Sequence, residues 1–183
     1  MAVQPPSVDL TFTAPDFNLL GVDGKYYSLQ NFQGCNALLV MFICNHCPYV
    51  KAIRERLVRD TADLLQHGVA SVAIMSNDVA DYPEDSFENM QKIAKEFSFP
   101  FPYLYDESQD IAKAYGAVCT PDFFGFNRDL QLRFRGRLDA SNRTTAALDA
   151  RRELLEGMLH VAKTGAAPEN QIPSIGCSIK WRR

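Results

Sequence analysis

Two cysteines, Cys44 and Cys47, are separated by two residues where an apolar run gives way to an amphipathic pattern. Thiols at this spacing, at a strand-to-helix junction, can close a small disulfide ring with little backbone movement, which suits reversible two-electron transfer. The N–H groups and dipole of a helix N-terminus favour the thiolate of the first cysteine. We therefore expect Cys44 to attack and Cys47, one turn further in and more shielded, to resolve.

His46 lies between the two cysteines and can stabilise the Cys44 thiolate as a cation or as a hydrogen-bond donor. Two other interpretations stay open: the cysteines fill the core, or they bind zinc together with His46. A zinc site normally takes a fourth ligand from a second Cys/His pair, which this sequence lacks. The spacing therefore favours redox chemistry, and we expect no metal and no other cofactor.

Strand and helix patterns alternate around the dithiol. Residues 37–43 form a continuous apolar run, typical of a central strand covered on both faces. Apolar residues then recur at helical spacing from Val50 to Leu65, before Gly68. The remaining expected elements are a hairpin around Asp23-Gly24, a helical turn from Ser28 to Phe32, a strand at 69–75, a helix at 87–97, a helix opened by an Asp106/Gln109 capping box and ended by Gly116, a hairpin of 123–126 with 130–135, a helix at 144–163 and an irregular tail at 164–183.

Length and composition predict one domain over residues 1–183, with its core at about 8–163, because 183 residues with 46% hydrophobic content can bury a sizeable core. The net charge of -3 is spread along the chain, so we expect no nucleic-acid or membrane partner. The start lacks the pattern of a secretory signal, and the five cysteines form an odd set that suits a reducing compartment. These features predict a cytoplasmic protein.

The order of hairpin, apolar strand, Cys-x-x-Cys, helix and a later Thr-Pro before two antiparallel strands resembles the thioredoxin superfamily, a central mixed sheet flanked by helices. Residues 14–29 look like the N-terminal hairpin extension of its peroxiredoxin-like (AhpC/TSA) branch, and the resemblance covers about 8–162. Three segments resemble a redoxin subgroup of that branch: CNHCPYVK at 44–51, CTPDFF at 119–124 and GCSIKW at 176–181.

The resemblance implies that Pro121 is a cis-proline facing the dithiol, and that the backbone before it, at Thr120, pairs with a bound thiol substrate. The chain departs from thioredoxin itself, whose buried proton-accepting acid has no match within residues 38–43. It also departs from the peroxiredoxin pattern Pro-x-x-x-Thr-x-x-Cys. Counting back from Cys47 places Val40 and Cys44 where Pro and Thr belong, and counting back from Cys44 places Ala37 and Met41 there.

Two further thiols are candidate accessory groups. Cys119 directly precedes Thr120-Pro121, and its role as a relay thiol or as a buried small hydrophobe stays open. Cys177 lies in the expected tail; it is either a resolving thiol, as in some peroxiredoxins, or part of a tail that only packs, and we favour packing. The row Arg133, Arg135 and Arg137 is expected to form a solvated face.

These residues predict a thiol-disulfide oxidoreductase that exchanges disulfides with a protein or small thiol partner through Cys44 and Cys47. The alternative is a thiol peroxidase that reduces hydroperoxides, since an accessible thiolate of low pKa also reacts with peroxide. A third possibility, from another class, is a non-catalytic or metal-binding module of the same fold.

Overall fold

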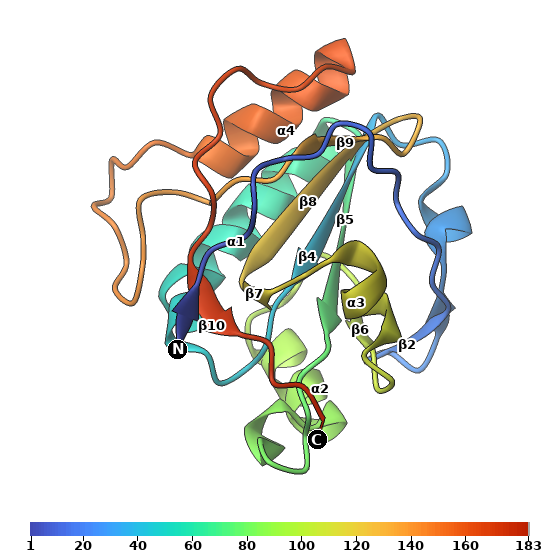
Figure 1. Ribbon diagram of the computed structural model, residues 1–183, viewed down its shortest axis with the longest axis vertical. Helices are drawn as coiled ribbons and strands as arrows, with labels where there is room; N and C mark the ends of the chain where they lie inside the picture. Colours follow the sequence, from blue (N-terminus) through green and yellow to red (C-terminus); the bar gives the residue numbers. More distant parts are fainter. Residues whose placement is uncertain (183) are drawn as a thin grey trace.

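The computed structural model describes residues 1–182, and its centre is a seven-stranded mixed sheet in the order β3-β2-β6-β5-β4-β8-β9 (Figure 1). A second, three-stranded sheet has the order β1-β10-β7. The strands are β1 (Ala2–Val3), β2 (Leu19–Gly21), β3 (Tyr26–Tyr27), β4 (Ala37–Phe42), β5 (Val69–Met75), β6 (Tyr103–Tyr105), β7 (Cys119–Thr120), β8 (Asp122–Asn127), β9 (Leu132–Phe134) and β10 (Gly176–Ser178).

Helices pack on both faces of the large sheet. They are η1 (Leu29–Phe32), α1 (Pro48–Gln66), η2 (Pro83–Asp85), α2 (Phe87–Glu96), α3 (Asp110–Tyr115) and α4 (Glu153–Thr164). Strand β4 is parallel to β5 and antiparallel to β8, so the sheet is mixed as expected. The N-terminal hairpin of β2 and β3 and the turn η1 are also where the sequence predicts them.

Strand β4 is buried along its whole length because it separates two apolar clusters. Leu39 and Met41 face the cluster that α1 and α4 cover, whereas Leu38 and Val40 face the cluster on the side of α3. Successive side chains of a strand point to opposite faces, so a continuous apolar run is what this position requires. The same strand carries the chain directly to Cys44.

The last helix begins nine residues later than predicted: α4 starts at Glu153 rather than Thr144. Residues 144–152 favour a helix by composition, but α1 binds their backbone. Arg56 donates hydrogen bonds to the carbonyls of Ala146 and Ala147, and the Thr145 hydroxyl donates to the Ala52 carbonyl at 2.7 Å. These tertiary contacts replace the first helical turns.

The predicted capping box is wrong, although the helix and its end at Gly116 are confirmed. Gln109 is itself the N-cap of α3, with a left-handed backbone at φ 66°. Asp106 accepts a hydrogen bond from Ala112 N–H at 2.9 Å, whereas the Gln109 amide donates to the carbonyls of Ser76 and Lys180. The side chain of Gln109 therefore fixes the C-terminal segment instead of the helix.

The sequence predicts an irregular C-terminal tail, but the tail contains the strand β10. Figure 1 shows this strand, in red, beside the blue N-terminal strand β1. On its other side β10 pairs with β7, and Cys177 lies opposite Thr120. No helix among residues 1–182 has the length and apolar character needed to cross a membrane.

We predict that Leu39→Ala lowers the free energy of unfolding by about 3 kcal/mol, because it leaves a cavity beneath α1 in a site with 0% exposure. Leu148→Ala is the matched control, since that side chain is 97% exposed and its removal is expected to change stability by less than about 0.5 kcal/mol. Urea denaturation measures both. Equal effects of the two substitutions would contradict the two-sided burial of β4.

Candidate active site

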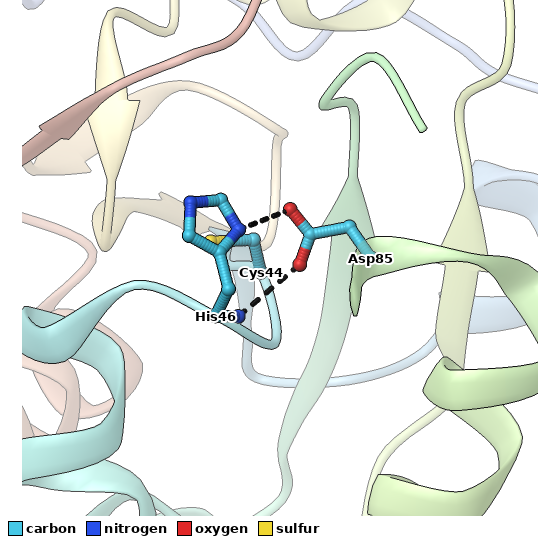
Figure 2. Close-up of side chains that lie close together, drawn as sticks. All are labelled: Cys44, His46 and Asp85. Atoms are coloured by element: carbon cyan, nitrogen blue, oxygen red, sulfur yellow. Dashed lines mark hydrogen bonds and ion pairs between the residues drawn. The ribbon is translucent and has the colours of Figure 1, made fainter. Parts of the chain in front are cut away.

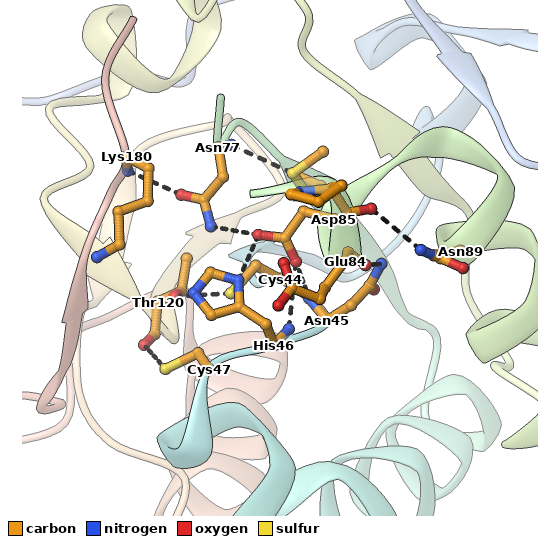
Figure 3. A network of polar contacts seen from close by, with 12 residues as sticks. Cys44, Asn45, His46, Cys47, Asn77, Glu84, Asp85, Asn89, Thr120 and Lys180 are labelled. Carbon is orange, nitrogen blue, oxygen red and sulfur yellow. Dashed lines mark hydrogen bonds and ion pairs between the residues drawn. The ribbon is translucent and has the colours of Figure 1, made fainter. Parts of the chain in front are cut away.

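The dithiol lies between the end of β4 and the start of α1. Cys47 is the N-cap of α1, and Pro48 fills the first helical position, where its missing N–H costs nothing. The Cys44 thiol lies 3.3 Å from the Thr120 hydroxyl, and the Cys47 thiol donates to the Thr120 carbonyl at 3.2 Å (Figure 3). The Thr120-Pro121 peptide bond is cis, as the resemblance implies.

Both thiols are buried, with Cys44 2% and Cys47 0% exposed. The sequence predicts a more accessible first cysteine, but exposure does not separate the two sulfurs in this structure. What does separate them is the set of groups around each one.

Several neighbouring groups act on the Cys47 sulfur. The Cys44 thiol, the Cys177 thiol and the backbone N–H groups of Val50 and Cys177 lower the pKa of Cys47 well below that of a free thiol, against the opposing effect of burial. Only the thiol form can donate to the Thr120 carbonyl, and that contact opposes ionisation. On balance, the neighbouring groups lower the pKa of Cys47 and favour its thiolate.

Cys44 has the opposite environment. Burial raises its pKa, and the hydrogen bond to Cys47 and the negative charge of Asp85 raise it further. These directions favour Cys47, rather than the predicted Cys44, as the sulfur that ionises more readily. Cys47 is the N-cap of α1, whereas Cys44 lies three residues before it, so the second cysteine is the one at the helix N-terminus.

Asp85 is the residue that the sequence analysis missed. It is fully buried in η2, and Figure 3 shows it at the centre of a polar network. One carboxylate oxygen accepts the backbone N–H groups of Asn45 and His46 at 2.7 and 3.2 Å. The other accepts from the His46 ring at 2.6 Å and from the Asn77 amide at 2.8 Å. Residues 38–43 contain no acid, and no spacing signal in the sequence connects them to position 85.

His46 is held by Asp85 rather than by a cysteine sulfur. Its Nδ1 atom points at the Asp85 carboxylate in Figure 2, and its ring stacks on Tyr82 with centroids 5.2 Å apart. The hydrogen bond to Asp85 raises the pKa of His46. Although burial opposes it, the hydrogen bonds from His46 and Asn77 lower the pKa of Asp85. The two groups therefore form an ion pair beside the dithiol.

Ligand atoms of Cys44, His46 and Asp85 lie within 4.8 Å of one another, which is close enough to consider a metal ion. The Nδ1 atom of His46 already bonds to Asp85, however, and one of the Asp85 oxygens binds backbone N–H groups. These atoms satisfy each other without a cation, so the geometry fits a hydrogen-bonded pair better than a metal centre.

Asn45 fixes the loop between the cysteines through three partners. Its side-chain oxygen accepts from the Tyr103 hydroxyl at 3.0 Å, and its backbone carbonyl accepts from Arg54 at 2.9 Å. Its amide donates to the Glu84 carbonyl at 3.0 Å. The backbone between the two sulfurs is therefore held from α1, β6 and η2.

The two accessory thiols differ in their surroundings. Cys119 is fully buried and points at the Pro121 carbonyl at 3.5 Å, and burial raises its pKa strongly. It behaves as a buried small side chain. Cys177 is half-buried, and burial together with its interaction with Cys47 raises its pKa to about 11. The structure brings Cys177, and not Cys119, against the dithiol.

The arginine row is not the solvated face that the sequence predicts. Arg135 is buried and donates two hydrogen bonds to Asp122 at 3.3 and 2.9 Å. Arg137 binds Glu153, and Arg133 donates to the carbonyls of Leu10 and Gly165. These partners lie in strand β8, in helix α4 and in loop segments, so strand alternation alone could not reveal them.

A family model described as AhpC/TSA matches residues 11–154. The chain belongs to the AhpC/TSA family. The fold is shared with two solved structures over nearly the whole chain. One, an uncharacterized conserved protein from Geobacillus kaustophilus, has 48% identity and a TM-score of 0.92, covering 100% of this chain and 97% of the other. The second, a hypothetical protein from Sinorhizobium meliloti, has 40% identity and a TM-score of 0.91, covering 98% of each chain.

More distant structures share the fold alone. A secreted Mycobacterium tuberculosis disulfide oxidoreductase has 20% identity and a TM-score of 0.59, covering 79% of this AhpC/TSA chain and 95% of its own. No curated protein matches the sequence. The prediction of a thioredoxin fold of AhpC/TSA type is thus confirmed.

We predict that Asp85→Asn lowers the pKa of His46, because the carboxylate is the main cause of its elevation. The titration of the His46 ring by NMR measures this, with the exposed His67 and His160 as internal references. Asp81→Asn, an exposed acid in the same loop, is the matched control. An unchanged His46 titration in Asp85→Asn would contradict the ion pair.

The ion pair also predicts how stability depends on pH. Because the pKa of His46 is raised in the folded protein, its protonated form contributes to stability. This contribution is fully present below pH 6.5, the ordinary pKa of histidine, and is lost as the pH rises through the raised pKa. Because the pKa of Asp85 is lowered in the folded protein, its ionised form contributes to stability. This contribution is present above pH 3.8, the ordinary pKa of aspartate, and is lost as the pH falls through the lowered pKa. The stability difference between wild type and Asp85→Asn, from urea unfolding, is therefore expected to be larger at about pH 5 than at about pH 8.5.

Proposed function

We propose that this protein is a thiol-disulfide oxidoreductase in which Cys44 and Cys47 alternate between a dithiol and a disulfide. The observation that carries the proposal is the dithiol at the start of α1, where Thr120 contacts both sulfurs and the neighbouring groups lower the pKa of Cys47 and raise that of Cys44. A thiolate next to a thiol is the arrangement that disulfide exchange needs, because one sulfur must attack and the other must follow. The AhpC/TSA family and the fold support the same chemistry.

The environment of the pair reverses the order of attack that the sequence predicts. We propose that the Cys47 thiolate attacks one sulfur of a partner disulfide, forming a mixed disulfide and releasing the other partner sulfur as a thiolate. Cys44 then loses its proton and attacks the Cys47 sulfur, and the second partner sulfur leaves. The partner gains two electrons, and the Cys44–Cys47 disulfide forms.

The partner is, in this proposal, a protein or small-molecule thiol or disulfide. Five free thiols and an odd cysteine count support a reducing compartment, and we propose the cytoplasm. His46 and Asp85 act here as positioning residues, since their bonds hold the backbone between the two sulfurs.

Thiol peroxidase activity is the second candidate, and the low pKa of Cys47 favours it. In that reaction the Cys47 thiolate attacks one peroxide oxygen, the O–O bond breaks, and the other oxygen leaves as water or an alcohol. Cys47 becomes a sulfenic acid, which Cys44 converts to the disulfide with loss of water. Stopped-flow mixing with hydrogen peroxide separates the two functions. A rate no faster than that of an ordinary free thiol would leave disulfide exchange alone.

We predict that Cys44→Ser retains a mixed disulfide on Cys47 after treatment with oxidised glutathione, because the resolving sulfur is gone. The experiment uses a Cys177→Ser background, so that no third thiol competes. The companion Cys47→Ser protein is expected to react at least about tenfold more slowly, since Cys44 is protonated at neutral pH. Intact-mass spectrometry measures both. Faster trapping at Cys44 in Cys47→Ser would restore the order predicted from the sequence.

We further predict one thiolate in the wild-type protein at a pH below 7, whereas a free cysteine titrates near about 8.5. Ultraviolet absorbance of the thiolate measures the titration. The signal is expected to disappear in Cys47→Ser and to remain in Cys35→Ser, whose half-buried thiol has a raised pKa because of burial. A wild-type midpoint at or above that of a free thiol would show that the donors do not act on Cys47.

A further inference from the structure

The C-terminal strand β10 occupies the backbone edge that the family resemblance assigns to a thiol substrate. Cys177 lies opposite Thr120 in antiparallel register, and Ser178 lies opposite Cys119. The next residue, Ile179, donates its N–H to the Val118 carbonyl at 3.2 Å. The chain's own tail is therefore already paired where a partner's backbone would pair.

Gly176 permits this close approach. A Cβ atom at this position would lie 2.1 Å from the Thr120 carbonyl oxygen and 3.0 Å from the Pro121 nitrogen. Both are backbone atoms, which cannot turn aside as a flexible side chain can. Glycine lacks the Cβ atom, so it is the residue that lets the tail rest directly on the cis-proline loop.

This register directs Cys177 at the dithiol. Residues directly opposite one another in an antiparallel pair project their side chains from the same face. The side chain of Thr120 contacts Cys44, so the side chain of Cys177 lies on the side of the two cysteines. Cys177 packs against the apolar cluster that contains Cys44 and Cys47, and its thiol is one of the groups that lower the pKa of Cys47.

We propose that Cys177 is a third redox-active thiol, with β10 acting as an intramolecular substrate whose sulfur exchanges into a Cys47–Cys177 disulfide. The proposal deepens the proposed function and rests on it for the origin of the Cys44–Cys47 disulfide. A tail held in register by a β-ladder delivers its thiol to the same place each time, which is the advantage of an intramolecular reactant.

The exchange step balances without a further reagent. Cys177 loses its proton to solvent, and its thiolate attacks the Cys47 sulfur of the Cys44–Cys47 disulfide. The bond between Cys47 and Cys177 forms as the bond between Cys44 and Cys47 breaks, and Cys44 leaves as a thiolate that takes up a proton. The step replaces the Cys44–Cys47 disulfide with a Cys47–Cys177 disulfide, so the number of disulfides does not change. The two oxidising equivalents come from the partner disulfide, which was reduced when the Cys44–Cys47 disulfide formed.

The decisive experiment uses the full-length Cys35→Ser/Cys44→Ser protein treated with oxidised glutathione. In this protein Cys47 is the remaining cysteine of tryptic peptide 26–51, and Cys177 is the cysteine of peptide 164–180. We expect mass spectrometry without reduction to find the two peptides linked. Cys47 recovered as a free thiol or as its glutathione adduct, with peptide 164–180 unlinked, would overturn the proposal.

Gly176→Ala, added to the same protein, tests the role of the tail strand. The new methyl group cannot coexist with the Thr120 carbonyl, so we expect loss of most of the linked peptide. Ser178→Ala is the matched control in the same strand and is expected to keep the link. Equal yields in the two proteins would show that the pairing of β10 does not deliver Cys177.

Wild-type protein gives the third readout. After oxidation, we expect a fraction of Cys44 to be alkylated by iodoacetamide while Cys47 is protected, and this fraction is lost in Cys177→Ser. The exchange tests in the Cys177→Ser background examine Cys44 and Cys47 alone. If the exchange tests fail while the Cys47–Cys177 link forms, the proposed function is rejected and this disulfide is kept. If the exchange tests succeed while the link is absent, only the role of Cys177 as a third redox-active thiol is rejected.

Discussion

The buried carboxylate of Asp85 is the constraint on which the arrangement of this site depends. A charge with 0% exposure is costly unless every lone pair is satisfied, and Asp85 meets that condition with four hydrogen bonds from three residues. Two bind the loop between the cysteines through the backbone, and one orients the His46 ring. The fourth comes from Asn77, whose side-chain oxygen accepts the backbone N–H of Lys180 at 2.9 Å. One carboxylate thus joins the dithiol loop, η2, the loop after β5 and the C-terminal tail.

The same carboxylate helps to make the two sulfurs unequal. Its negative charge disfavours a second negative charge at Cys44, whereas the helix N-terminus and neighbouring thiols favour one at Cys47. Protonated His46 offsets part of the charge of Asp85 and adds a positive charge next to the pair. Which sulfur is the nucleophile therefore depends on the protonation states of Cys44, Cys47, His46 and Asp85, and not on the cysteine spacing alone.

The sequence predicts those features of the fold that depend on local pattern. The apolar run at 37–43 fixes β4, and the amphipathic repeat after Pro48 fixes α1, so the position of the dithiol follows from neighbours in the chain. Contacts between remote segments leave no such pattern. Asp85 meets His46 across 39 residues, and Arg56 binds carbonyls 90 and 91 residues away, which removes the first turns of the predicted last helix.

The sequence does not reveal which of the two sulfurs ionises more readily, for a more specific reason. A Cys-x-x-Cys spacing places both thiols near a helix start without saying which of them is the N-cap. That depends on where the helix begins, and Pro48 sets it one residue after the second cysteine. The tail differs for another reason. Residues 165–175 are irregular as predicted, and only the approach of Gly176 to Thr120 reveals that Gly176–Ser178 form a strand.

Both sulfurs are buried, so the site must open before a protein partner can react, and we infer that the tail, whose strand β10 pairs with β7 beside them, is the element that moves. Beyond β10 it is held by hydrogen bonds from Lys180 to Asn77, from Asp78 and Gln109 to Lys180, and from Arg182 to Gln109. At about 1 kcal/mol net for each bond, opening costs several kcal/mol, which is within the range of local unfolding in native proteins. A Cys47–Cys177 disulfide would abolish that opening, because the covalent bond ties β10 to α1. Oxidation of the tail thiol would therefore close the site to large partners while leaving the Cys44 thiol reduced.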